Sequence, residues 1–156
     1  IARRHKVGNG VLMAPDLDPD IARAKLYQII SDPGLAWGPA PDPRVVIEHP
    51  PGYHMTIYVS PHDKALAASS LLFGAVARLG QIGASTVTPE EVQEVRRLGY
   101  IDMIQFTGEA GLIGHSYFVP SPKVSSDIIA MIRYGLHPNE PGRPLEEIAR
   151  PYWRIP

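Results

Sequence analysis

The sequence predicts an α/β protein in which a mostly parallel sheet is flanked by helices. The main observation is that short apolar segments rich in β-branched and aromatic residues alternate with amphipathic helical segments, a pattern typical of βα units. The length of 156 residues suits about one domain. A hydrophobic fraction of 44% is sufficient for a packed core. Because proline (17) and glycine (14) are abundant, we also expect long, shaped loops.

Three segments have the composition of buried strands, and turn residues bound each of them. They cover residues 7–14, 53–60 and 100–107. Four further segments have helical composition and lie between or after these strands. They cover residues 21–30, 64–79, 89–98 and 122–134. Thr88 followed by Pro89 is a typical start for the third helix, since threonine caps helices and proline suits the first turn.

Three strands are fewer than a free-standing parallel sheet normally has. We therefore expect residues 1–136 to be the C-terminal portion of one domain, incomplete without an N-terminal half that precedes Ile1. The strand at 7–14 should then expose an unpaired edge, and we expect the missing half, as a cleaved or separate polypeptide, to pair with it. Residues 137–156 are predicted to form a Pro/Arg-rich tail.

Charge and composition give no support to several classes of partner. With 15 basic and 16 acidic residues the net charge is −1, so there is no electrostatic case for nucleic acid or an anionic membrane surface. The absence of cysteine excludes disulfides, thiolate zinc sites and a cysteine nucleophile. No apolar run approaches about 18 residues, so no transmembrane segment is expected in this chain. The compartment, cytoplasm or bacterial cell envelope, stays open because the chain begins without a targeting pattern.

No cofactor or metal is expected from the motifs. Neither of the glycine-rich phosphate-binding patterns occurs, which argues against a nucleotide-binding enzyme. Asp16, Asp18 and Asp20 alternate as in a calcium-binding loop, but the required glycine and glutamate are missing. We interpret these aspartates as a polar strand exit and a helix start, with Asp16 as a possible neighbour of an active site.

Two residues occupy positions where parallel sheets carry their chemistry, beyond the carboxyl ends of strands. Asp63 lies three residues past the strand ending at Ser60, and His115 lies in a glycine-rich loop past the strand ending near Thr107. A carboxylate can fix the tautomer of a histidine whose other nitrogen takes a proton from a serine. In α/β-hydrolases the chain order is serine, acid, histidine, and this chain supplies the last two in that order.

The runs VLMAPDLDPDIARAKL, TIYVSPHDKALAASSLLFGAVARLGQIG and IDMIQ…GHSYFVPSPKVSSDI resemble the C-terminal part of a bacterial α/β-hydrolase family, esterase- or lipase-like and of undefined specificity. The resemblance covers roughly residues 7–133. It implies the α/β-hydrolase fold, with Asp63 as the acid and His115 as the base of a catalytic triad. The nucleophilic serine of the family lies upstream, in a G-H-S-x-G elbow just before the strand that is here 7–14.

This chain departs from the family in one large respect. No G-x-S-x-G sequence occurs in it, so the nucleophile and the oxyanion hole built around it are absent. Oxyanion stabilisation is usually the largest single catalytic contribution. We therefore expect the chain to be inactive alone and to require the N-terminal half.

Each candidate also has a structural interpretation. Asp63 precedes a helix and is a typical N-cap, and His115 could be a loop histidine bonded to backbone. Ser116 follows Gly-His as a nucleophile would, but Phe118 occupies the position where the elbow needs a small residue. Ser60 could hydrogen-bond near Asp63, although a structural role in the turn is favoured.

Other residues give weaker indications. Four further histidines lack partners at metal-ligand spacing and are interpreted as structural, surface or terminal residues: His5, His54, His62 and His137. Three arginines of the tail are expected to be solvated: Arg143, Arg150 and Arg154. The adjacent Tyr152-Trp153 suggests that the tail docks on a surface that the sequence does not identify. The proline-rich excursion 33–52, with Trp37, could be a pocket wall, a lid or a packed loop.

The function that these observations favour is serine-dependent hydrolysis of a small carboxylic ester. The alternative is a non-catalytic interaction or structural domain built on a hydrolase scaffold, because fold does not fix function.

Overall fold

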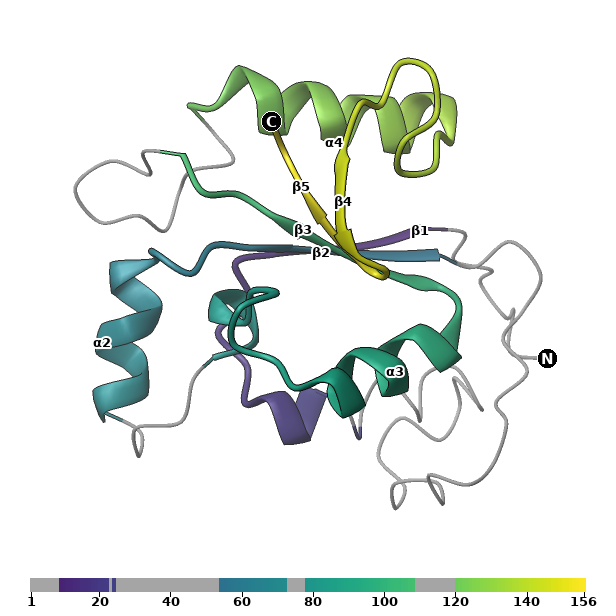
Figure 1. Cartoon of the computed structure of the whole chain (residues 1–156). Coiled ribbons are helices and arrows are strands. Elements are labelled where there is room, and N and C mark those ends of the chain that lie inside the picture. The colour runs from purple at the N-terminus through teal and green to yellow at the C-terminus, as the bar shows by residue number, and fades with distance from the viewer. Residues whose placement is uncertain (1–8, 23, 25–53, 73–77, 109–119) are drawn as a thin grey trace, which may run out of the picture.

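A computed structural model describes residues 9–22, 24, 54–72, 78–108 and 120–156 of the chain (Figure 1). They form a five-stranded sheet with the order β1-β2-β3-β5-β4. The strands are β1 (Asn9–Met13), β2 (His54–Val59), β3 (Ile101–Gln105), β4 (Glu146–Ala149) and β5 (Tyr152–Arg154). All neighbouring pairs are parallel except β4 and β5, which are antiparallel. The predicted α/β fold with a mostly parallel sheet is therefore confirmed.

The expectation of only three strands is wrong. Both additional strands come from the segment 137–156, and β5 pairs in parallel with β3. Tyr152 and Trp153 of β5 are buried, so the suggestion that this segment docks through its aromatic pair is confirmed. Strands of three and four residues are too short to show the alternation by which sequence patterns identify a strand. β5 forms here because β3 offers it hydrogen-bond partners, and β4 forms because β5 offers partners to it.

Helices lie on both faces of the sheet (Figure 1). α4 (Pro122–Tyr134) covers one face, while α3 (Pro89–Leu98) and the 3-10 turn η2 (Leu79–Gln81) lie on the other. One buried cluster contains Ala14, Tyr58, Leu66, Ile104, Phe106, Val124, Leu145, Trp153 and Ile155. A second contains Ala22, Met55, Ile57, Val59, Leu79, Tyr100, Ile101, Met103 and Tyr152. Alternate residues of β2 belong to different clusters, as the period of a strand requires.

Local sequence signals explain where α3 begins and ends. The Thr88 hydroxyl accepts the Glu91 N–H at 3.2 Å, and the Glu91 carboxylate accepts the Thr88 N–H at 2.7 Å. These two bonds form a capping box. Gly99 ends the helix with φ of 70°, a left-handed conformation that glycine adopts without strain. The predicted start after Thr88 and end near Gly99 are confirmed.

The two edges of the sheet, within the part of the chain that the structure describes, are β1 and β4. Among the residues that the structure describes, β1 pairs with β2 alone, which agrees with the free edge expected for 7–14. None of the helices among the described residues has the length and apolar character that crossing a bilayer requires.

Candidate active site

Asp63 follows the carboxyl end of β2 through a tight turn and begins α2 (Lys64–Leu72). Its N–H donates to the Ser60 carbonyl at 3.1 Å, and its Oδ1 accepts the Leu66 N–H at 3.0 Å. The residue is buried, with 1% of its surface exposed. Asp63 is therefore the N-cap of α2, as its structural interpretation predicted. The cap holds its carboxylate at the sheet edge where α/β proteins place their ligands and catalytic groups.

The exit of β3 lies directly beside the exit of β2. Val59 and Gln105 are register partners, and the Phe106 N–H donates to the Val59 carbonyl at 2.9 Å. The loop that leads to His115 consequently starts next to the turn that carries Asp63. His115 itself lies outside the described residues, as do Ser116, Trp37, His5 and the excursion 33–52. The pairing of Asp63 with His115 stays a prediction.

The 3-10 turn η2 connects the exits of β1 and β2. The Ser60 N–H donates to the Gly80 carbonyl at 2.8 Å, and the Gly80 N–H donates to the Pro15 carbonyl at 2.9 Å. The Gln81 side-chain amide donates to the backbone carbonyl of Asp63 at 3.4 Å. These bonds fix the backbone around Asp63 against the segment that follows β1.

Glycine is required at position 80 by close approach. A Cβ there would lie 2.6 Å from a methyl group of Leu66 and 2.8 Å from the carbonyl carbon of Ala14. The second of these neighbours is backbone and cannot move aside. A side chain at position 80 would therefore separate η2 from the end of β1 and from α2.

Two of the three alternating aspartates have structural contacts in the described part of the chain. The Asp18 carboxylate accepts the backbone N–H of Asp20 at 2.9 Å and that of Ile21 at 3.2 Å, which makes it a helix N-cap. The Asp16 carboxylate lies 3.2 Å from Arg78 Nε, just before η2. Across the described residues there is no group of three or more His, Cys, Asp or Glu side chains that could hold a metal ion.

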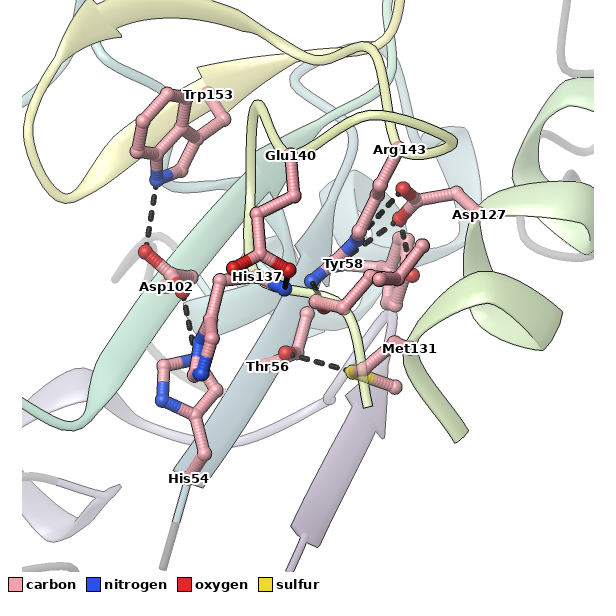
Figure 2. A network of polar contacts seen from close by, with 11 residues as sticks. His54, Thr56, Tyr58, Asp102, Asp127, Met131, His137, Glu140, Arg143 and Trp153 are labelled. Atoms are coloured by element: carbon pink, nitrogen blue, oxygen red, sulfur yellow. Dashed lines mark hydrogen bonds and ion pairs between the residues drawn. The ribbon is translucent and has the colours of Figure 1, made fainter. Parts of the chain in front are cut away.

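A different polar network occupies the opposite, amino end of the strands (Figure 2). Asp102, the second residue of β3, contacts His54 Nε2 through its Oδ2 at 2.6 Å and accepts the Trp153 indole N–H through its Oδ1 at 2.7 Å. The side chains of His54 and Asp102 are only 17% and 11% exposed. Both carboxylate oxygens are thus used, and the network links β2, β3 and β5.

His137 extends this network from the connection after α4. Its ring packs nearly perpendicular to that of His54, with 5.3 Å between the ring centroids. From the sequence, His54 is interpreted as a structural or surface residue, because no partner lies at metal-ligand spacing. The one available signal was Asp102, because a carboxylate within the apolar run YIDMIQF must be buried and therefore paired. His62, by contrast, is exposed.

A second buried network lies between β2 and α4 (Figure 2). The Asp127 carboxylate accepts the Tyr58 hydroxyl at 2.5 Å, Arg143 Nε at 2.8 Å and Arg143 Nη2 at 3.2 Å. Arg143 is 1% exposed, so the expectation that it is solvated is wrong. An arginine stem and fork can be buried when a carboxylate satisfies its donors, and this partner lies 16 residues away. Arg150 and Arg154 are exposed, as expected.

These surroundings change the proton affinity of the buried groups. Burial, together with the charge and hydrogen bond of Asp127, raises the pKa of Tyr58 far above its usual range. Burial by itself would lower the pKa of Arg143, but the hydrogen bond and charge of Asp127 outweigh it and raise that pKa. Burial also raises the pKa of Tyr152 to about 12, with a smaller contribution from Glu91. All three groups keep their protons at neutral pH and have structural roles.

The comparison with protein families agrees with this arrangement, although the chain matches neither a curated protein nor a solved structure. The matching family is described as alpha/beta hydrolase of unknown function (DUF900), and the match spans residues 2–133. This range contains β1 to β3, α4 except for its last residue, and both Asp63 and His115. The match covers most of the chain, and the sheet is mostly parallel, as this fold requires. The chain therefore belongs to this alpha/beta hydrolase family.

Proposed function

We propose that the chain supplies the acid and the histidine of a serine hydrolase that cleaves carboxylic esters. Asp63 is the acid and His115 the base, and the nucleophilic serine belongs to an upstream segment. The observation that carries the proposal is the position of Asp63, buried and fixed as a helix cap at the end of β2. The neighbouring exit of β3 leads toward His115.

The reaction is acyl transfer to water. The serine oxygen bonds to the ester carbonyl carbon while His115 takes the serine proton, and His115 then gives that proton to the departing alcohol oxygen. Water next attacks the acyl-enzyme and gives a proton to His115. Collapse releases the carboxylic acid and returns the proton to the serine. Transfer of this kind contributes about 10²–10⁴-fold to the rate.

Capping α2 and orienting His115 are compatible tasks for Asp63. An ionised carboxylate has two oxygens with about four acceptor positions, and the Leu66 N–H uses one position on Oδ1. The N-terminus of a helix also favours a negative charge nearby. That negative charge is what stabilises an imidazolium during the reaction. The cap thus supplies rigidity and uses only part of the acceptor capacity of the group.

The upstream segment would dock at β1. A strand that pairs in parallel with β1 would have its carboxyl end on the same side of the sheet as the carboxyl end of β2, where Asp63 lies. A serine immediately after that added strand would then face the exits of β2 and β3. In this arrangement the partner of the chain is the N-terminal half of the same protein. The substrate is a small acyl ester, and the chain alone is inactive.

Fluorophosphonate labelling tests the proposal, because this reagent modifies only an activated serine. The chain alone and a polypeptide extended by the upstream segment are each treated, and intact and peptide mass spectrometry locates the label. We expect the label on an upstream serine of the extended protein and none on the chain alone. Label on Ser116 or any other serine of residues 1–156 would contradict the divided triad. An extended, folded protein without label would favour a non-catalytic interaction domain instead.

A further inference from the structure

The hydroxyl of Ser60 is a buried polar group that the fold leaves unused. Ser60 is fully buried, and its Oγ has no hydrogen-bond partner among the described residues. The backbone of the same residue is fully engaged, since its N–H donates to Gly80 at 2.8 Å and its carbonyl accepts from Asp63 at 3.1 Å. The peptide is therefore fixed, and rotation about χ1 is the freedom that remains to the side chain.

A buried hydroxyl without a partner lowers stability, because it loses its bonds to water and gains none in return. The turn after β2 does not require it, since backbone bonds close that turn. Alanine would make the same backbone bonds without leaving an unpaired donor. The presence of serine at this position is therefore not explained by folding. A buried polar group that lowers stability in this way is typical of functional sites.

The position of Ser60 indicates which group its hydroxyl serves. The bond from the Asp63 N–H to the Ser60 carbonyl closes a four-residue turn, and such turns keep their first and last Cα atoms within about 7 Å. The Ser60 hydroxyl and the Asp63 carboxylate thus lie on the same short turn and are both buried. Rotation about χ1 can direct the hydroxyl toward the carboxylate.

We propose that Ser60 is a positioning residue, whose hydroxyl donates a hydrogen bond to the Asp63 carboxylate in the working enzyme. This inference rests on the proposed function, in which Asp63 orients His115. The added hydrogen bond holds the carboxylate in one rotamer and supports its charge while the imidazolium forms. Ser60 itself does not contact the substrate or exchange a proton.

Ser60→Ala in the extended protein tests this role, with the fluorophosphonate labelling rate and the melting temperature as paired readouts. We expect labelling to slow roughly tenfold, as loss of a group that orients a catalytic residue does. The melting temperature should stay equal or rise, because an unpaired hydroxyl is removed. Ser60→Thr, which keeps the hydroxyl, should restore much of the rate. Thr56→Val is the matched control: it removes a buried hydroxyl within β2 that is bonded to Met131, and it should leave labelling unchanged.

Three results would overturn the inference. Labelling of Ser60→Ala at the unmodified rate would show that the hydroxyl has no role in the reaction. A lower melting temperature or a failure of Ser60→Ala to fold would show that the hydroxyl has a structural partner. An equal slowing in Thr56→Val would assign the effect to packing. Absence of label in the unmodified extended protein would instead reject the proposed function, and this inference with it.

Discussion

The two ends of the parallel strands use their aspartates differently. At the amino end, both oxygens of Asp102 are occupied, one by His54 at 2.6 Å and the other by Trp153 at 2.7 Å. At the carboxyl end, Asp63 caps a helix, and the nearby hydroxyl of Ser60 has no partner within the described part of the chain. At the amino end, both oxygens of the aspartate have hydrogen-bond partners within the fold. The carboxyl end retains a polar group, the Ser60 hydroxyl, that folding does not need.

This difference indicates a division of labour along the sheet. Satisfied buried networks join elements that are distant in sequence and make the sheet rigid. A polar group that is fixed in position but not used in a hydrogen bond of the fold can take part in catalysis. Catalysis depends on groups whose positions are fixed before the substrate arrives. The same exchange of aspartate for asparagine should therefore have opposite consequences at the two ends.

Asp63→Asn carries the largest expected effect. Asparagine caps helices about as well as aspartate, so the melting temperature should change little. The amide cannot stabilise an imidazolium and can select the wrong histidine tautomer, which lowers the rate of a serine hydrolase by roughly 10⁴-fold. The measurement is the fluorophosphonate labelling rate of the extended protein.

Asp18→Asn is the control, because Asp18 also caps a helix through its carboxylate but belongs to no proposed triad. It should label at the unmodified rate. If Asp63→Asn labels equally fast, Asp63 is a structural cap and the proposed acid is wrong.

Asp102→Asn should reverse this result. The amide oxygen can accept the Trp153 N–H, while the amide nitrogen can only donate, so His54 Nε2 loses its acceptor unless the ring changes tautomer. Leaving one buried partner unsatisfied should lower the free energy of unfolding by about 1–3 kcal/mol, measured by urea denaturation of the chain. The labelling rate of the folded, extended protein should not change. Unaltered stability would mean that this network contributes little, and a slower labelling rate would remove the distinction between the two ends.

The elements that the sequence predicts correctly are those with a local signal. The strands β1 to β3 have continuous apolar runs, and α3 has its cap and its terminal glycine within about a dozen residues. The turn position of Asp63 followed from the strand that precedes it. These features need no knowledge of distant partners, which is why pattern and propensity suffice for them.

The features that the sequence does not predict have partners far apart along the chain. Arg143 was expected in solvent because its partner Asp127 lies on a helix 16 residues earlier. His54 and Asp102 are separated by 48 positions, and no spacing rule connects them. β5 depends on β3 for its hydrogen bonds, and its three residues carry no period of their own. Tertiary context decides such elements.

The last predicted effect concerns β5 and appears only at alkaline pH. Burial raises the pKa of Tyr152 from 10 to about 12, so the folded state keeps the phenol proton after the unfolded state has lost it. Stability from this group is complete below about pH 10 and declines between pH 10 and 12, by up to about 1.4 kcal/mol per pH unit. Tyr152→Phe has no proton to lose, so its stability should fall less steeply over this window. Urea denaturation at a series of pH values measures both slopes. Parallel slopes would show that the Tyr152 phenol ionises as readily in the folded protein as in the unfolded chain, and that β5 does not seal it within the core.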